Sequence, residues 1–443
     1  MGNEIRIEDY DCIGFDLDHT LLRYNITNLV RMEYECLSEF LVKQRGYDPE
    51  YLYKPLTGDA IDFMQKGLIL DLDKGNILKI SADGTILLAS HGTKMLTTRQ
   101  IEETYTNNGQ WEALKLLTND PVAVWNGPVS LKLRALLDYF DMPFALVFAR
   151  AVDALDAKNS IPHYDIWPDI CAAAVDMYDR GQFKKDAGNF FPQLKKNPEK
   201  YLHKCSQNTI NWLKLLRNKK NNRKLTFLIT GSNADFTNFT ATYAMGSDWK
   251  SLFDVIVCFA KKPGFFTESR PFWSVSGETH QEVEKISDTK IVQGGMYSQG
   301  NWNGLKEFLS RTCNNPSPKC LYIGDNLIQD IYVPSKFCGL DTVVINEEYH
   351  AEILSPLDLH PDRAYLVSDN NWGSYFYLPN HSLTHWSNYI KRYARICIPS
   401  IDFIAGFPVD HVFEAFDEAS GINDSITANT KANGFHPHHS SHV

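Results

Sequence analysis

Five short apolar runs, each closed by polar residues, constrain the fold of this chain more than any other feature of its sequence. Continuous apolar runs of this length are typical of strands that are buried on both faces. Helical patterns lie between them, for example at 209–220 and 301–313. The alternation of strand and helix predicts an α/β fold with a doubly wound parallel sheet. The runs are DCIGFD (11–16), KLTFLIT (224–230), DVIVCFA (254–260), KCLYIGD (319–325) and DTVVINEE (341–348).

A large insertion separates the first two runs. Residues 17–223 lie between them, whereas a strand–helix–strand unit needs only about 30 residues. We therefore predict a Rossmann-like core that is interrupted after its first strand by a cap. The predicted core is 9–44 and 161–410, the cap is 45–160, and 411–443 is a C-terminal extension. The extension is predicted to be disordered from about residue 424, where the apolar period ends.

The tripeptide Asp-Leu-Asp occurs twice, at 16–18 and at 71–73. The second copy lies in the segment 70–90, which carries two turn signals and is predicted to be β-rich. Lys-Gly-Asn follows it, which indicates a hairpin turn that we expect Asp73 to cap. A helical part of the cap is expected near 130–140. The first copy differs, because it closes the first apolar run and is accompanied by further polar strand ends.

Polar side chains follow the apolar runs at the points where the predicted strands end. The carboxyl ends of parallel strands meet at one edge of a sheet, and ligands bind there. Each of these residues alone is compatible with an ordinary cap or turn. Their occurrence at successive strand ends favours one shared site. The set is Asp16, Asp18, Thr230, Lys262, Asp325 and Asp330.

The first members of this set have the chemistry of phosphoryl transfer. Asp16 could attack phosphorus and form an aspartyl-phosphate. Asp18 could protonate the leaving oxygen and later activate water. The Thr230 hydroxyl, beside the backbone N–H groups of Gly231 and Ser232 at a possible helix start, could hold phosphate oxygens.

The remaining members supply charge. Lys262 would place a positive charge where negative charge gathers in the transition state. Asp16 and Asp325 could hold Mg²⁺, a hard cation that prefers oxygen ligands, and Asp330 could support that metal shell. The predicted cofactor is therefore Mg²⁺.

Four segments resemble the motifs of the haloacid dehalogenase superfamily: FDLDHT, LITGSN, Lys262 in AKKPGFF, and YIGDNLIQD. The first matches the Asp-x-Asp-x-Thr signature of that superfamily. The resemblance implies that Asp16 is the nucleophile and Asp18 the acid/base, with Mg²⁺ bound by Asp16, the Asp18 backbone carbonyl and Asp325. An Asp at the second position of the signature implies a phosphatase.

Further segments are similar to the cytosolic purine 5′-nucleotidase family, over roughly residues 9 to 410. They include GFDLDHTLLRYN, LDLDKGNILKISADGTILLASHGTKM and YFDMPFALVFARAVD. The resemblance implies a cap after the first motif, hydrolysis of a nucleoside 5′-monophosphate and possible homo-oligomers. It places substrate contacts at Phe140, Asp141, Asp176, Tyr178 and Lys184.

The resemblance is weaker where the base would be recognised. The sequence TGSN stands where the purine enzymes have Thr-Asn-Ser, and the segment 169–184 lacks the Arg and His that those enzymes use there. Dephosphorylation is therefore better supported than a purine substrate. A sugar phosphate or a phosphoprotein stays open as the substrate, and so does a non-enzymatic scaffold or regulatory protein that retains the fold.

Composition narrows the class of partner. The formal net charge of −10 disfavours nucleic-acid binding, which depends on Lys and Arg. The first ten residues are polar, and no apolar run approaches the roughly 18 residues that span a bilayer. We expect a cytoplasmic protein whose partner is a small phosphorylated molecule, rather than nucleic acid or a membrane.

Overall fold

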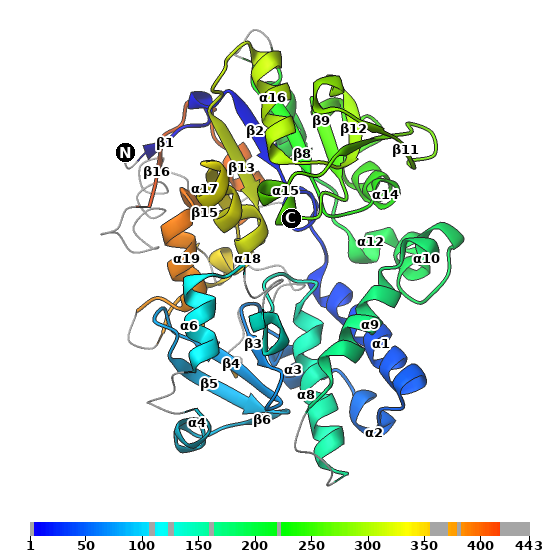
Figure 1. Cartoon of the computed structure of the whole chain (residues 1–443), viewed down its shortest axis with the longest axis vertical. Coiled ribbons are helices and arrows are strands. Elements are labelled where there is room, and N and C mark those ends of the chain that lie inside the picture. Colours follow the sequence, from blue (N-terminus) through cyan, green and yellow to red (C-terminus); the bar gives the residue numbers. More distant parts are fainter. Residues whose placement is uncertain are drawn as a thin grey trace, which may run out of the picture.

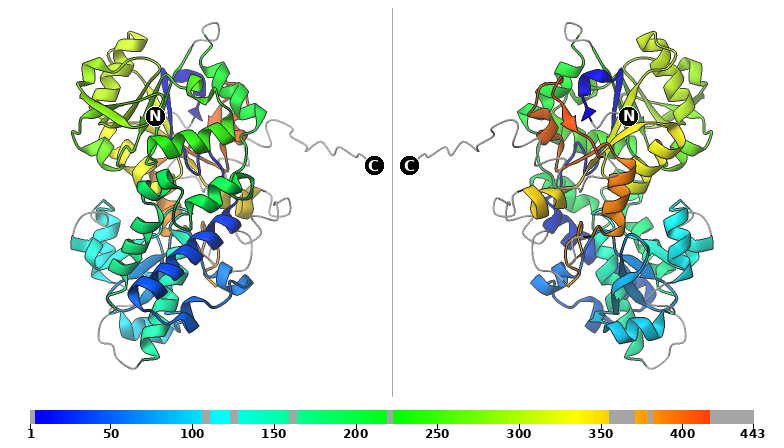
Figure 2. Two further views of the ribbon diagram at one scale, coloured as in Figure 1. Left: turned by 90° about the vertical axis from the view of Figure 1, so that its right-hand side faces the viewer. Right: turned by 90° about the vertical axis from the view of Figure 1, so that its left-hand side faces the viewer.

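The computed structural model describes residues 4–105, 111–122, 128–158, 164–218, 223–354, 371–378 and 382–416. These residues form two bodies, one above the other in Figure 1 and seen from the side in Figure 2. The upper body contains a nine-stranded sheet, and the lower one contains a five-stranded sheet. The predicted disorder from residue 424 concerns a segment outside the described residues.

All five predicted strands lie in the nine-stranded sheet, whose order is β11-β10-β12-β9-β8-β2-β13-β14-β15. The seven strands from β12 to β15 run parallel. The doubly wound α/β fold predicted from the sequence is confirmed. The five predicted strands are β2 (Cys12–Phe15), β8 (Leu225–Ile229), β9 (Val255–Cys258), β13 (Cys320–Gly324) and β14 (Asp341–Ile345).

Four strands of this sheet were not predicted. β12 (Gly295–Gln299) reads GMYSQ and has no apolar run, and β15 (Ile396–Ile398) has only three residues. β10 (Phe272–Val275) and β11 (Glu282–Ile286) form an antiparallel hairpin at one edge. β11 is mostly exposed, so burial does not impose an apolar pattern on it.

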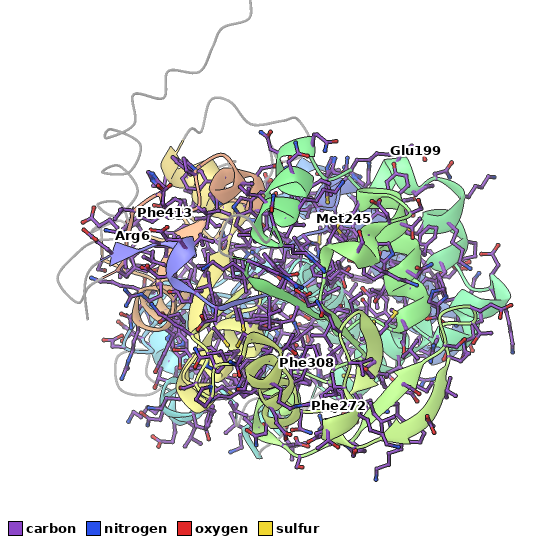
Figure 3. All side chains as sticks on the ribbon, turned by 90° about the horizontal axis from the view of Figure 1, so that it is seen from above. Arg6, Glu199, Met245, Phe272, Phe308 and Phe413 are labelled. Atoms are coloured by element: carbon purple, nitrogen blue, oxygen red, sulfur yellow. The ribbon has the colours of Figure 1, made fainter. Side chains whose placement is uncertain are left out.

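Helices cover both faces of the sheet, as a parallel sheet requires. Ile13 and Phe15 of β2 pack into one apolar cluster, and Cys12 packs into the other. Figure 3 shows Met245 and Phe308, which belong to these two clusters, on opposite sides of the sheet. The first cluster includes residues of α13 (Gln207–Leu216), α14 (Ala234–Met245) and α20 (Ile401–Ala405), and the second includes α16 (Trp302–Cys313), α17 (Val333–Cys338) and α19 (His385–Tyr393).

The lower body is built largely from the segment between β2 and β8. Its sheet is antiparallel throughout, in the order β6-β5-β4-β3-β7. The helices α1 (Ile26–Arg45), α8 (Met142–Asp156) and α9 (Trp167–Met177) lie beside one another there. The predicted β-rich piece at 70–90 is confirmed. The strands are β3 (Ile69–Asp71), β4 (Asn76–Ile80), β5 (Ile86–His91), β6 (Lys94–Met95) and β7 (Leu133–Ala135).

Two local predictions for this body were wrong. The segment 130–140 is not helical, because β7 within it pairs with β3 at the edge of the sheet. The turn after the second Asp-Leu-Asp is capped by Asp71 and not by Asp73: Asp71 Oδ1 accepts hydrogen bonds from the backbone N–H groups of Asp73 and Lys74, both at 3.2 Å.

The two bodies are joined by polar contacts from late in the chain. Trp372 Nε1 donates to the Phe63 carbonyl (2.8 Å), and Trp386 Nε1 donates to the Gly67 carbonyl (2.7 Å). The buried Lys66 ammonium contacts Glu348 at 3.0 Å. These contacts hold the lower body against the carboxyl ends of the core strands.

A short strand near the start of the chain pairs with one near the end of the described residues. β1 (Glu4–Ile5) pairs with β16 (Phe413–Glu414), and Figure 3 shows Arg6 and Phe413 close together there. Among the described helices, none is both long enough and apolar enough to cross a membrane.

Candidate active site

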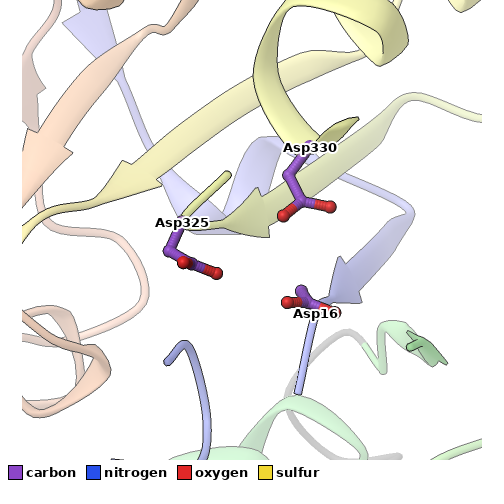
Figure 4. A group of neighbouring side chains, drawn as sticks. All are labelled: Asp16, Asp325 and Asp330. Carbon is purple, nitrogen blue, oxygen red and sulfur yellow. The ribbon is translucent and has the colours of Figure 1, made fainter. Parts of the chain in front are cut away.

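Three carboxylates meet at the carboxyl ends of β2 and β13. Asp16 directly follows β2, and its N–H donates to the Ile323 carbonyl of the adjacent β13 (2.8 Å). Asp325 follows β13, and Asp330 lies on the helical turn beyond it. Carboxylate oxygens of Asp16, Asp325 and Asp330 lie within 4.8 Å of one another (Figure 4). Gly324 permits this approach, because a Cβ there would stand 2.4 Å from the Asp330 Cβ.

Lys262 links two of these carboxylates. Its Nζ donates to Asp16 Oδ1 (2.8 Å) and to Asp330 Oδ1 (2.6 Å). Burial alone would lower the pKa of Lys262, but the charges of Asp16 and Asp330 outweigh it and raise that pKa well above its usual value. The ammonium therefore stays charged, and Asp330 holds it beside Asp16.

Burial and mutual repulsion act on the carboxylates in the opposite direction. Burial raises the pKa of Asp16, although Lys262 lowers it, and it raises the pKa of Asp330 to about 6. The pKa of Asp325 is raised well above its ordinary value by burial and by the charges of Asp16, Asp330 and Asp138. Lys262 forms ion pairs with Asp16 and Asp330, whereas the charge of Lys66 only weakly offsets the repulsion at Asp325.

The donor set fits a hard divalent cation. All three converging groups are carboxylates, and a cation among them would relieve the repulsion that raises their pKa values. Asp16 and Asp325 are the candidate ligands, since both oxygens of Asp330 are engaged, Oδ1 by Lys262 and Oδ2 by the Asn326 N–H (3.2 Å), whereas Lys262 bonds to Oδ1 of Asp16. Thr20 Oγ1 donates to Asp325 Oδ1 (3.3 Å) and so orients that ligand.

Asp18 stands beside this cluster with hydroxyl donors on both oxygens. Ser232 Oγ donates to Oδ2 and the Tyr24 hydroxyl donates to Oδ1, each at 2.6 Å. Burial raises the pKa of Asp18, and the two hydroxyl donors and Lys262 only partly offset this. A raised pKa favours the protonated form of the carboxyl group, which a proton donor requires.

The predicted phosphate-binding residues border the same space. Thr230 follows β8, is fully buried, and accepts a hydrogen bond from the Ser232 N–H at Oγ1 (3.1 Å). The Thr230 side chain also hydrogen-bonds to Asp18, which helps to lower the pKa of that carboxyl group. α14 begins two residues beyond Ser232, so the positive end of its dipole lies close by. A Cβ on Gly231 would meet no atom within 4 Å, which leaves room beside its backbone.

Two adjoining cavities open at these residues. The acidic cavity, of about 210 Å³, is lined by the carboxylates, Lys262, His19 and Asn326. The aromatic cavity, of about 250 Å³, is lined by six aromatic side chains together with Arg180, Asn233 and Asp235. Phe140, Gly231 and Ser232 belong to both cavities, so the two are continuous.

The structure brings two of the five predicted substrate contacts to these cavities. Phe140 lines both, and Tyr178 lines the aromatic cavity. Asp141 lines neither, because its Oδ2 accepts from the Leu137 N–H (2.9 Å). Asp176 and Lys184 are exposed and bond to Gln182 and Gln281.

Sequence reasoning missed other residues that line the cavities. Asp138 enters the acidic cavity from the lower body and accepts from Asn326 Nδ2 (3.3 Å). Arg180 enters the aromatic cavity, where its Nε donates to Asp235 (2.9 Å). Asp138 follows β7 of the lower sheet and not one of the apolar runs of the core. Arg180 is positioned by its contacts with Asp235 and the His280 carbonyl. No local pattern marks Asp138, whereas Arg180 lies within 169–184, the segment in which the sequence comparison found no equivalent of the Arg that the purine enzymes use.

Comparison with known proteins agrees with this geometry. A profile of the 5′ nucleotidase family matches residues 1–362. The chain is 36% identical over 465 residues to 5′-nucleotidase domain-containing protein 1 of Homo sapiens, covering 99% of this chain and 97% of that protein. This chain belongs to the 5′ nucleotidase family. A more distant relative is 5′-nucleotidase domain-containing protein 2 of Homo sapiens, 27% identical over 74% of this chain and 59% of that protein.

Membership of the 5′ nucleotidase family confirms the resemblance found in the sequence. It supports a nucleotidase or phosphatase function in general, and hence a hydrolase of phosphoric monoesters. The family assignment does not itself identify the metal, the nucleophile or the substrate of this member.

Proposed function

We propose that this protein is a Mg²⁺-dependent phosphomonoesterase that hydrolyses nucleoside 5′-monophosphates through an aspartyl-phosphate on Asp16. The observation that carries the proposal is the convergence of Asp16, Asp325 and Asp330 within 4.8 Å, with Lys262 bonded to two of them. Asp18 lies next to this group and is held by two hydroxyls.

In the first step, an Asp16 carboxylate oxygen attacks phosphorus and the bond from phosphorus to the ester oxygen breaks. Asp18 donates its proton to that leaving oxygen, so the alcohol departs neutral. Thr230 and the backbone N–H groups near Ser232 bind phosphoryl oxygens, and Lys262 stabilises their charge.

In the second step, Asp18 is a carboxylate and accepts a proton from water, which attacks the aspartyl-phosphate and releases inorganic phosphate. Asp16 returns as a carboxylate, and Asp18 is again protonated. Mg²⁺ bound by Asp16 and Asp325 would neutralise phosphoryl charge and orient the group for attack.

The aromatic cavity supports a planar organic group on the substrate. Phe140 stands between the acidic and aromatic cavities, so an ester whose phosphate lies near Asp16 extends past this ring. Stacking on Phe140 and Tyr178 suits a nucleobase. A cavity of about 250 Å³ suits a small molecule better than a phosphoprotein loop.

The test compares phosphate release by wild type, Asp16→Asn and Asp71→Asn, with Mg²⁺ and a panel of nucleotides and other phosphate esters. Asp16→Asn is expected to lose about a thousandfold or more. Asp71→Asn changes the corresponding residue of the second Asp-Leu-Asp and is expected to retain the wild-type rate. BeF₃⁻ should bind at Asp16 and not at Asp71. Equal residual rates for wild type and Asp16→Asn on every ester would contradict the proposal.

A further inference from the structure

We propose that Tyr24 is a positioning residue for Asp18: its hydroxyl fixes the carboxyl group in the direction needed to protonate the leaving oxygen. This inference rests on the proposed function, because it assigns a role within the first step of that reaction. Tyr24 lies six residues after Asp18, in the connection that leads from β2 into α1. It does not line either cavity, so it acts through Asp18 and not on the substrate.

The geometry at Asp18 leaves little freedom to its side chain. The Tyr24 hydroxyl holds Oδ1 and Ser232 Oγ holds Oδ2, both at 2.6 Å. These donors belong to segments more than 200 residues apart in the chain. A carboxyl group held at both oxygens cannot rotate about its Cβ–Cγ bond without breaking a short hydrogen bond.

The Tyr24 ring is itself held in place. Its backbone forms a bridge with Leu202, and the flanking Asn25 N–H donates to the Tyr201 carbonyl (2.8 Å). The ring is 2% exposed and contacts the rings of His19 (centroids 4.7 Å apart) and Phe140 (5.4 Å). The hydroxyl oxygen therefore has a fixed position, set by both the core and the lower body.

A hydroxyl is the appropriate group for this task. The proposed reaction requires Asp18 to carry a proton in the first step and to lack it in the second. A tyrosine hydroxyl donates to the carboxylate, and the protonated acid keeps an acceptor lone pair for the same donor, so the bond persists in both states while the acid proton stays available to the leaving oxygen. Displacing an acid by about 1 Å from its proton acceptor can cost about a hundredfold in rate.

The second Asp-Leu-Asp provides a matched comparison. There the Tyr105 hydroxyl donates to Asp71 Oδ2 at 2.7 Å, and both residues are buried. Tyr105→Phe thus removes a bond of the same kind and similar length from a carboxylate outside the cavities. The change in kcat/KM of Tyr105→Phe therefore shows what the loss of a buried tyrosine–aspartate hydrogen bond costs when that bond lies outside the cavities.

The experiment measures kcat/KM of the full chain with Mg²⁺ on two esters that differ in leaving group. An alkyl ester such as a nucleoside 5′-monophosphate needs protonation of its leaving oxygen, whereas p-nitrophenyl phosphate releases a stable anion. Tyr24→Phe is expected to lower kcat/KM by about 10- to 100-fold for the alkyl ester and by less than about 3-fold for p-nitrophenyl phosphate. Tyr105→Phe should leave both values unchanged, and Tyr24→Phe should add no further loss to Asp18→Asn.

Three outcomes would overturn the inference. They are an unchanged kcat/KM for Tyr24→Phe on both esters, an equal loss on both, or a further loss in the Asp18→Asn background. If Tyr24→Phe does not fold, Tyr24→4-fluorophenylalanine keeps the length of the side chain and cannot donate, and it must show the same dependence on the leaving group. Failure of the proposed function is a different result, because wild type and Asp16→Asn would then have equal rates.

Discussion

Asp325→Asn is expected to stabilise the metal-free protein while removing its response to Mg²⁺. The substitution keeps the shape of the side chain and the oxygen that accepts from Thr20. It removes one negative charge from a cluster whose oxygens lie within 4.8 Å of one another. At an effective dielectric constant of about 20, two unit charges at that distance repel by about 3.5 kcal/mol. Because the raised pKa of Asp325 relieves part of this repulsion, we expect a gain of about 2–3 kcal/mol.

The assay is thermal unfolding of wild type and variant, in EDTA and in Mg²⁺. For a chain of this length roughly 1–2 °C per kcal/mol applies, so Tm in EDTA should rise by about 2–6 °C in the variant. Wild type should instead gain about 2.7 kcal/mol from Mg²⁺ at a hundred times its Kd, and the variant should lose most of that gain. The lead of the variant over wild type in EDTA should therefore largely disappear in Mg²⁺.

Asp254→Asn is a control that distinguishes the effect of relieving charge repulsion on Tm from the effect of replacing any buried aspartate. Asp254 is fully buried but is paired with Arg217 and Arg223, so Asp254→Asn should lower Tm equally with and without Mg²⁺. A lower Tm for Asp325→Asn in EDTA would refute the repulsion argument. An undiminished response of that variant to Mg²⁺ would refute Asp325 as a ligand.

Three more predictions follow from the cavities. Gly231→Val should lower kcat/KM with little change in Tm, because its side chain would extend into open space at the wall shared by both cavities. Phe140→Ala should raise KM for nucleotides by about 5- to 100-fold, from the 1–3 kcal/mol of lost stacking, with a smaller effect on kcat. Burial and the charge of Asp141 raise the pKa of Asp138 from 3.8 to about 7, so this carboxyl group stabilises the fold below pH 4 and that stabilisation is lost as the pH rises through 7. Asp138→Asn should therefore flatten the fall in the free energy of unfolding between pH 4 and pH 7, by up to ~4 kcal/mol, and an unchanged slope in denaturant unfolding across that range would contradict the assignment.

Sequence reasoning located the five core strands because burial on both faces forces continuous apolar runs. It failed where other constraints decide the conformation. The segment 130–140 was predicted to be helical, but β7 within it pairs with β3, and this pairing is a tertiary contact that a local pattern does not indicate. The turn at 71–76 shows the same limit, since either aspartate could cap it in isolation. In the folded protein Asp71 is the cap: its Oδ1 accepts from the Asp73 N–H, and its Oδ2 accepts from the Tyr105 hydroxyl.

Within the candidate site, the sequence indicated the residues that follow core strands but not those that come from the insertion. Asp16 and Asp325 could be anticipated together because each directly follows a strand, and parallel strands end at one edge of a sheet. Asp138 and Arg180 could not, because they reach the cavities from helices and loops of the insertion. The predicted substrate contact was Asp141, which lies three residues after Asp138. Its carboxylate accepts from the Leu137 N–H and does not line the cavities.

The sequence by itself determined the class of fold, the strand ends that carry the acidic site and the family to which the chain belongs. These depend on short-range patterns: apolar runs, their spacing and the residue that closes each one. Only the tertiary structure decided which hydroxyls hold Asp18, which carboxylates converge and which rings form the aromatic cavity. Such contacts join residues far apart in the chain: Ser232 reaches Asp18 because β8 lies beside β2 in the sheet, and no local pattern in the sequence indicates which strands become neighbours.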